Sequence, residues 1–194
     1  MSKSLRHFAL ALAAAGFSSC ALSGIGLVAS AAAAGQVPMV GGAPMYPSKN
    51  IVENAVNSKD HTTLVAAVKA AGLVDTLEGP GPFTVFAPTN AAFAKLPAGT
   101  VQTLLKPENK GMLTKILTYH VVPGRITAQQ IASMAAMHHG TATLKTVEGE
   151  PIMLRKAGGT WWVVDSKGGK ARITIANVLQ SNGVIHVVDR VLMP

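Results

Sequence analysis

One eleven-residue stretch, residues 83–93, constrains the fold of this chain more than any other. It reads FTVFAPTNAAF, and its first four residues are aromatic or β-branched, which is typical of a strand. A short, nearly continuous apolar run of this kind suits a strand that is covered on both faces. Pro88 cannot donate to a ladder, so we expect the strand to end there. Thr89 or Asn90 can then cap a helix, with Phe93 pointing back at the strand.

This stretch is the first of three motifs in the chain. Tyr119-His120 is the second, and residues 182–192, NGVIHVVDRVL, are the third. In these residues and their order, the chain resembles the fasciclin-like (FAS1) family over residues 48–194. The resemblance implies an α+β fold, a β-sandwich-like wedge of about seven strands flanked by several α-helices. It also implies structural roles for Thr84, Phe86, Pro88, Thr89, Asn90, Phe93, His186 and Asp189.

The periodicity of the chain agrees with this fold class. Apolar residues at helical spacing predict helices between residues 48 and 137, and short β-rich runs between Gly-rich turns predict hairpins from Thr141 onward. Helices that precede strands are typical of an α+β domain. Residues 35–47 are rich in Pro and Gly, so we expect a linker or an N-terminal arm there. The chain has no internal repeat, and we expect one copy of the domain.

Residues 1–34 have the layout of a secretory signal peptide. Lys3 and Arg6 precede an apolar run that ends in four alanines. We expect cleavage near Ala34 and a secreted or periplasmic protein of the bacterial type. Two alternatives stay open. The run is long enough for an uncleaved membrane anchor, and Cys20 follows a sequence loosely like a lipoprotein processing box.

Cleavage would leave a basic protein without cysteine. Cys20 is the single cysteine, so the mature chain could form no disulfide. Of the 17 Lys and Arg, two lie in the signal segment, which leaves 15 against nine Asp and Glu and a net charge of about +6. Such a charge attracts acidic polysaccharides, lipid headgroups and nucleic acid alike.

Sequence motifs for catalysis are absent. The chain contains no GxSxG elbow, phosphate-binding loop, HExxH helix or CxxC pair. Glu148 and Glu150 are expected in a turn between two strands, where solvated carboxylates are the ordinary case. We therefore expect a non-enzymatic protein without a cofactor. A hydrolase would need converging acid and base groups.

The polar residues of the second and third motifs predict a structural network. Because buried polar groups are normally paired, we expect Tyr119, His120, His186 and Asp189 to form a hydrogen-bonding set that fixes the sheet. The resemblance also implies a second role for Tyr119 and His120, which is contact with a partner.

Four residues near the end of the last predicted helix combine thioether and imidazole groups, which copper accepts. They are Met134, Met137, His138 and His139. The alternative is that the methionines fill the core and the histidines form a polar helix end.

Residues 155–172, RKAGGTWWVVDSKGGKAR, predict two hairpins with a basic surface. The basic residues are Arg155, Lys156, Lys167, Lys170 and Arg172. Trp161 and Trp162 must lie on opposite sides of a strand, so we expect one in the core and the other at the surface, where it can stack on sugars or cations. The sequence is compatible with both a binding face and a solvated hairpin pair.

The resemblance implies a function in cell adhesion or in cell-surface and extracellular-matrix interaction. Animal members bind integrins partly through an acidic residue before the third motif, but this chain has Asn177-Val178-Leu179 there. We therefore expect a protein or an acidic polysaccharide as partner, and no nucleic acid. Membrane contact is expected only through the signal segment or lipidation. The alternative function is a carrier of an apolar ligand such as a carotenoid.

Overall fold

The computed structural model describes residues 37–194. The signal peptide predicted for residues 1–34, together with the anchor and the Cys20 lipidation that are its alternatives, lies outside the described residues. Within residues 37–194, every helix is too short or too polar to span a membrane.

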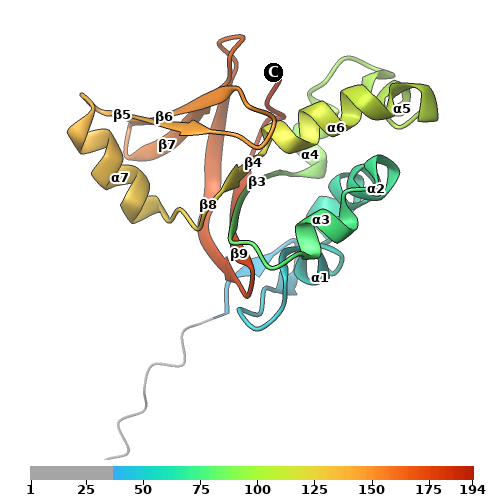
Figure 1. Ribbon diagram of the computed structural model, residues 1–194, viewed down its shortest axis with the longest axis horizontal. Helices are drawn as coiled ribbons and strands as arrows, with labels where there is room; N and C mark the ends of the chain where they lie inside the picture. Colours follow the sequence, from blue (N-terminus) through green and yellow to red (C-terminus); the bar gives the residue numbers. More distant parts are fainter. Residues whose placement is uncertain (1–36) are drawn as a thin grey trace, which may run out of the picture. The chain divides into compact units, whose positions relative to one another are not determined.

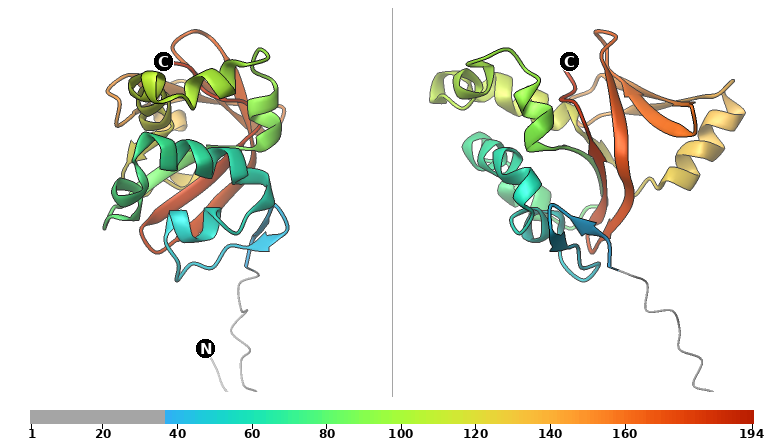
Figure 2. Two further views of the ribbon diagram at one scale, coloured as in Figure 1. Left: turned by 90° about the vertical axis from the view of Figure 1, so that its right-hand side faces the viewer. Right: turned by 180° about the vertical axis from the view of Figure 1, so that it is seen from behind.

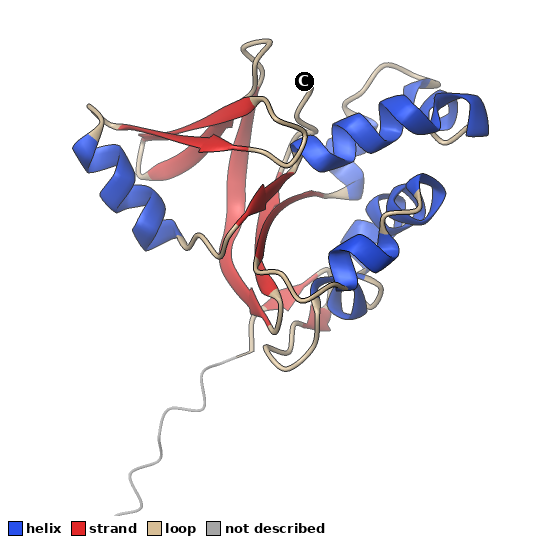
Figure 3. Ribbon diagram, in the orientation of Figure 1, coloured by secondary structure: helices blue, strands red, loops and turns tan. Residues whose placement is uncertain are grey.

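The described chain starts with a small hairpin, continues mainly with helices and ends with a run of strands. Figure 3 distinguishes the helices from the strands by colour. The strands are β1 (Met39–Val40), β2 (Ala43–Pro44), β3 (Phe83–Pro88), β4 (Val121–Pro123), β5 (Thr141–Lys145), β6 (Pro151–Ala157), β7 (Thr160–Val164), β8 (Lys170–Gln180) and β9 (Gly183–Val188). The α-helices are α1 (Ile51–Ala55), α2 (Thr62–Ala71), α3 (Val74–Glu78), α4 (Asn90–Ala94), α5 (Thr100–Leu104), α6 (Lys110–Tyr119) and α7 (Ala128–Met137). Short 3-10 helices, Lys59–His61 and Pro107–Asn109, precede α2 and α6. This content confirms the predicted α+β class.

Seven strands form one mixed sheet in the order β4-β3-β9-β8-β7-β6-β5 (Figure 1). Strands β3 and β9 are parallel, and the other neighbours in the sheet are antiparallel. The two ends of the sheet approach each other, because the amide of Val147, just after β5, donates to the carbonyl of Val121 in β4 at 2.8 Å. The sheet therefore curls almost into a barrel, and the predicted seven strands with flanking helices are confirmed.

Strand β3 separates two hydrophobic cores, because alternate residues of a strand point to opposite faces. Val85 and Ala87 belong to the cluster beneath α1–α6, whereas Phe86 belongs to the cluster beneath α7. Figure 2 shows these two groups of helices on opposite sides of β3 and β9. The strand is thus covered on both faces and ends at Pro88, and Phe93 of α4 packs in the cluster of Val85, all as predicted.

The residues before α1 take part in the first core. Val40, Ala43 and Met45 are buried in it, at 3%, 8% and 2% exposure. The amide of Met45 donates to the carbonyl of Pro38 at 2.9 Å, which closes the β1–β2 hairpin. The segment predicted as a linker or an N-terminal arm is therefore packed against the domain from about Pro38 onward.

One of the two predicted helix caps has a different task. Thr89 caps α4, and its hydroxyl accepts from the amide of Ala92 at 3.2 Å. The neighbouring Asn90 faces away from its own helix: its side chain accepts from the amide of Thr63 at 3.0 Å and donates to the carbonyl of Lys59 at 2.8 Å. Of the two candidates, Thr89 is therefore the cap, and the Asn90 side chain instead joins α4 to the start of α2.

Candidate functional site

The side chain of Tyr119 is held inside the domain. It lies at the end of α6 with an exposure of 0%. Its hydroxyl donates to the carbonyl of Pro151 at 3.2 Å and accepts from the amide of Ser166 at 2.9 Å. Tyr119 therefore joins α6 to the start of β6 and to the turn between β7 and β8, and burial raises the pKa of its hydroxyl.

His120 is equally inaccessible, with an exposure of 2%. Its Nδ1 lies 2.7 Å from the carbonyl oxygen of Ile116, and its Nε2 lies 2.9 Å from the amide nitrogen of Leu192. A carbonyl only accepts and an amide only donates, so the ring is neutral with its proton on Nδ1. Burial lowers the pKa of His120 to about 4, which keeps it neutral. The prediction that Tyr119 and His120 contact a partner is wrong, because neither side chain reaches the surface.

Thr84 and His186 hold the same loop, which connects β4 to α7. The Thr84 hydroxyl donates to the carbonyl of Gly124 at 2.6 Å and accepts from the amide of Ile126 at 2.8 Å. His186 Nε2 lies 2.9 Å from the carbonyl oxygen of Ile126, and its ring stacks on Phe86 with centroids 5.5 Å apart. Burial lowers the pKa of His186. Thr84 of β3 and His186 of β9 therefore have a structural role, which is to hold the β4–α7 loop against the sheet.

Asp189 lies just beyond β9 and is only partly buried. Its carboxylate accepts from the amide of Arg172 at 2.8 Å and lies 3.7 Å from Lys95 Nζ and 3.8 Å from Arg172 Nε. It has no bond to the motif residues Tyr119, His120 or His186. The prediction of one hydrogen-bonding set among these four is wrong, since each ties a different segment to the sheet.

The basic residues predicted for two hairpins divide between the two sides of the sheet. Register aligns Trp162 with Arg155 of β6 and with Arg172 of β8. Aligned residues of antiparallel strands share a face, so the indole lies between the two arginines. A strand spacing of about 4.8 Å places the two arginine backbones about 10 Å apart. Trp161 lies on the opposite side and packs against the second core.

More residues point to the same side as Trp162, which we call the outer sheet face. On β5 to β8 the alternate positions are buried, so the remaining ones face outward. The basic and larger apolar residues of the outer sheet face are Lys145, Met153, Arg155, Trp162, Val164, Lys170 and Arg172. The four basic residues are exposed, and the three apolar residues are half-buried among them.

Two of the predicted basic residues lie elsewhere. Lys156 is aligned with Trp161 on the other side of the sheet, and Lys167 lies in the β7–β8 turn. Lys145 lies outside residues 155–172 and was missed. Alternation along β5 and the register of the β5–β6 hairpin are the signals that place it.

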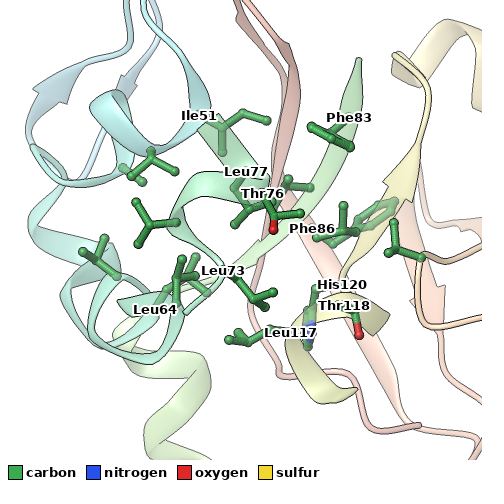
Figure 4. A pocket seen from close by; sticks show the side chains of 18 of the residues that line it. Ile51, Leu64, Leu73, Thr76, Leu77, Phe83, Phe86, Leu117, Thr118 and His120 are labelled. Atoms are coloured by element: carbon green, nitrogen blue, oxygen red, sulfur yellow. The ribbon is translucent and has the colours of Figure 1, made fainter. Parts of the chain in front are cut away.

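A second feature is an apolar cavity of about 70 Å³ between α1–α3, α6 and β3 (Figure 4). Figure 4 shows Leu64, Leu73, Leu77, Phe83 and Leu117 converging on it. Its surface is almost wholly apolar. A cavity that accepts a benzene ring has a volume of about 150 Å³, which is larger than this one. An apolar ligand of that size or larger would therefore require the helices to move apart.

The residues considered for copper differ in their surroundings. Met134 packs against the second core, Met137 is 70% exposed, and His138 and His139 are exposed beyond the end of α7. In the described part of the chain, no cluster of three or more His, Cys, Asp or Glu side chains could hold a metal ion.

Comparisons with known proteins agree with this architecture. The family described as Fasciclin domain matches residues 59–194. Protein sll1483 of Synechocystis sp. is 52% identical over 144 residues, which are 74% of this chain and 73% of that protein. Immunogenic protein MPB70 of Mycobacterium bovis is 37% identical over 145 residues, 72% of this chain and 66% of that protein.

Among solved structures, a FAS1 domain pair from the insect cell adhesion molecule fasciclin I has the same fold. The TM-score is 0.67 at 18% identity, and the match covers 75% of this chain and 51% of the pair.

Proposed function

Because this chain belongs to the fasciclin domain family, we propose that it is an exported, non-enzymatic domain that mediates cell adhesion or interaction at a cell surface. The match over residues 59–194 carries the proposal. Its likeness to a domain pair from an insect cell adhesion molecule supports it. Further support comes from Tyr119, His120 and His186, which are buried in structural hydrogen bonds and so are unavailable for proton transfer to a substrate.

The proposed place of action is the secreted or periplasmic side of the membrane. The layout of residues 1–34 supports export. The partner in this proposal is a protein or an acidic polysaccharide of the surface, which the basic charge of the chain favours. Nucleic acid is not a partner, and membrane contact is confined to the N-terminal segment.

Loss of the chain should reduce attachment of the host cells to surfaces or to one another. The measurement is a retention assay under flow with the parent strain, a deletion strain and the deletion strain that carries the gene again. We expect fewer retained deletion cells and recovery upon complementation. Equal retention of the parent and the deletion strain would contradict the adhesion function.

A carrier of an apolar ligand is the second candidate, and the 70 Å³ cavity favours it. If the carrier function is correct, protein purified from its own source should yield an apolar compound upon solvent extraction. Ala55 lines the cavity, so Ala55→Leu should fill part of it and lower the yield. The control is Ala136→Leu on an exposed position of α7. Parent protein without extractable compound would contradict this candidate.

A further inference from the structure

We propose that the outer sheet face binds an acidic polysaccharide. In this arrangement Trp162 stacks on a sugar ring, while Arg155, Arg172, Lys170 and Lys145 contact carboxylate or sulfate groups on either side. The inference rests on the proposed function, since it names the partner of an exported surface domain.

The first argument is the free charge of this face. Within residues 37–194, Lys145, Arg155 and Lys170 take part in no salt bridge. Arg172 shares Asp189 with Lys95, so the positive charges exceed the negative ones there as well. A cation without a protein partner can pair with an anionic ligand at no cost in lost internal contacts.

The other nearby carboxylates are already engaged. Glu148 and Glu150 pair with Lys115 at 3.4 and 3.8 Å, beyond the Lys145 end of the face. Asp165 is buried in the β7–β8 turn, where it accepts from the amides of Lys167 at 3.1 Å and Gly169 at 2.6 Å. The outer sheet face is therefore a basic surface, and the carboxylates at its border are held by Lys115 and by backbone amides.

The second argument is the arrangement of the central residues. Trp162 is half-buried and is aligned with an arginine on each side. An indole has only two side-chain torsions, so it loses little conformational freedom upon binding. Arginine guanidinium groups form paired hydrogen bonds to planar carboxylates and to sulfate-like anions. The Trp162 indole can stack on one sugar ring of a polysaccharide. The guanidinium groups on its two sides can then bind acidic groups of the neighbouring sugars.

The third argument favours a polymer over a membrane. The apolar residues Met153, Trp162 and Val164 lie half-buried within the pleat of the sheet and do not form a protruding apolar ridge. Insertion into a bilayer interface requires an exposed apolar face. A linear polymer can instead lie across the strands. It would contact the aligned residues Arg155, Trp162 and Arg172 and the aligned residues Met153, Val164 and Lys170. Single-stranded nucleic acid is also a linear polymer and could bind in the same way.

Reversing charge on the outer face should weaken glycan binding, whereas the same reversal elsewhere should not. The test variant is Arg155→Glu with Lys170→Glu, both on the outer sheet face. The matched control is Lys156→Glu with Lys167→Glu, which makes the same change of net charge on the other side of the sheet and in the β7–β8 turn. Trp162→Ala is a third variant that leaves the charge unchanged. Circular dichroism confirms that each variant is folded.

Binding is measured with polygalacturonate and dextran sulfate as acidic probes and with neutral dextran, single-stranded oligothymidylate and phosphatidylglycerol vesicles for comparison. We expect the parent to bind an acidic glycan more tightly than the other three probes, and binding to weaken as salt rises. The test variant should bind about tenfold more weakly, and the matched control within about twofold of the parent. Trp162→Ala should lose the part of the affinity that salt does not screen.

Several results would overturn the inference. They are equal weakening in the test variant and the matched control, no effect of Trp162→Ala, or tighter binding to oligothymidylate or vesicles than to either acidic glycan. If the parent binds no acidic glycan while the deletion strain still loses attachment, the inference fails and the adhesion function stands. If the parent binds no acidic glycan and the deletion strain attaches as well as the parent, both the inference and the adhesion function are rejected.

Discussion

Gly183→Ala is expected to abolish cooperative folding of the domain or to lower its free energy of unfolding by at least about 3 kcal/mol. Gly183 begins β9 and is aligned with Phe83 in the parallel pair β3–β9. A methyl group at this position would overlap the carbonyl oxygen of Phe83 and lie 2.9 Å from its carbonyl carbon. Both atoms are backbone within the ladder between the two cores, so neither can move without breaking it.

The matched control is Gly111→Ala. Gly111 lies in α6, and a methyl group there would meet nothing within 4 Å. Alanine is favoured over glycine in a helix by roughly 0.5–1 kcal/mol, so this variant should be slightly more stable than the parent. Urea unfolding followed by tryptophan fluorescence measures both. A Gly183→Ala protein with the unfolding midpoint of the parent would refute the close strand pairing.

Acidification should destabilise the domain before most carboxylates titrate. The folded pKa of His120 is about 4, and burial lowers it from its ordinary value of 6.5. The unfolded chain therefore takes up the proton first. The contribution of neutral His120 to the free energy of unfolding is fully present above pH 6.5 and is lost as the pH falls toward 4. We expect a loss of about 2 kcal/mol from His120 between pH 7 and pH 5. Burial also lowers the pKa of His61 and His186, which adds to the loss with the same sign.

The measurement is thermal unfolding at half-unit steps from pH 7.5 to pH 5. His120→Gln should be less stable than the parent at pH 7 but should lose less stability on acidification. His138→Gln is the control, because His138 is exposed at the end of α7, so its replacement should leave the stability at pH 7 unchanged. A melting temperature that stays constant over this range would contradict the buried neutral histidines.

The fold could be predicted because its strongest signals are local. The apolar run of β3, the proline that ends it and the polar residues after it lie within residues 83–93. The choice between Thr89 and Asn90 as the cap was beyond the sequence, because both residues can cap a helix. What decides it is α2, which brings the amide of Thr63 to Asn90.

The roles of the other motif residues depend on contacts across the chain. His120 bonds the amide of Leu192, and Asn182 accepts from the amide of Ile51 at 3.0 Å and donates to the carbonyl of Leu77 at 2.7 Å. These partners lie between 72 and 131 positions away along the chain, and periodicity carries no information on such pairs. A prediction of burial was therefore within reach, whereas a prediction of the partners was not.

For the outer sheet face, too, local features could be predicted from the sequence, whereas contacts between strands could not. The opposite sides of Trp161 and Trp162 follow from strand alternation and are confirmed. That Arg155 and Arg172 flank Trp162, while Lys156 does not, depends on the register of three strands. The apolar cavity depends on how α1–α3 and α6 pack against β3, which no single segment of the sequence encodes.

Hydroxyl-radical footprinting of the protein bound to the cell envelope of its host tests the surface-interaction account most directly. Trp162 and Met153 on the outer sheet face should become less oxidised in the bound state. Met112 and Met137 lie away from this face and are 60% and 70% exposed, so their oxidation should not change. Oxidation of Trp162 and Met153 at the rate of the unbound protein, while the protein remains bound, would contradict the account.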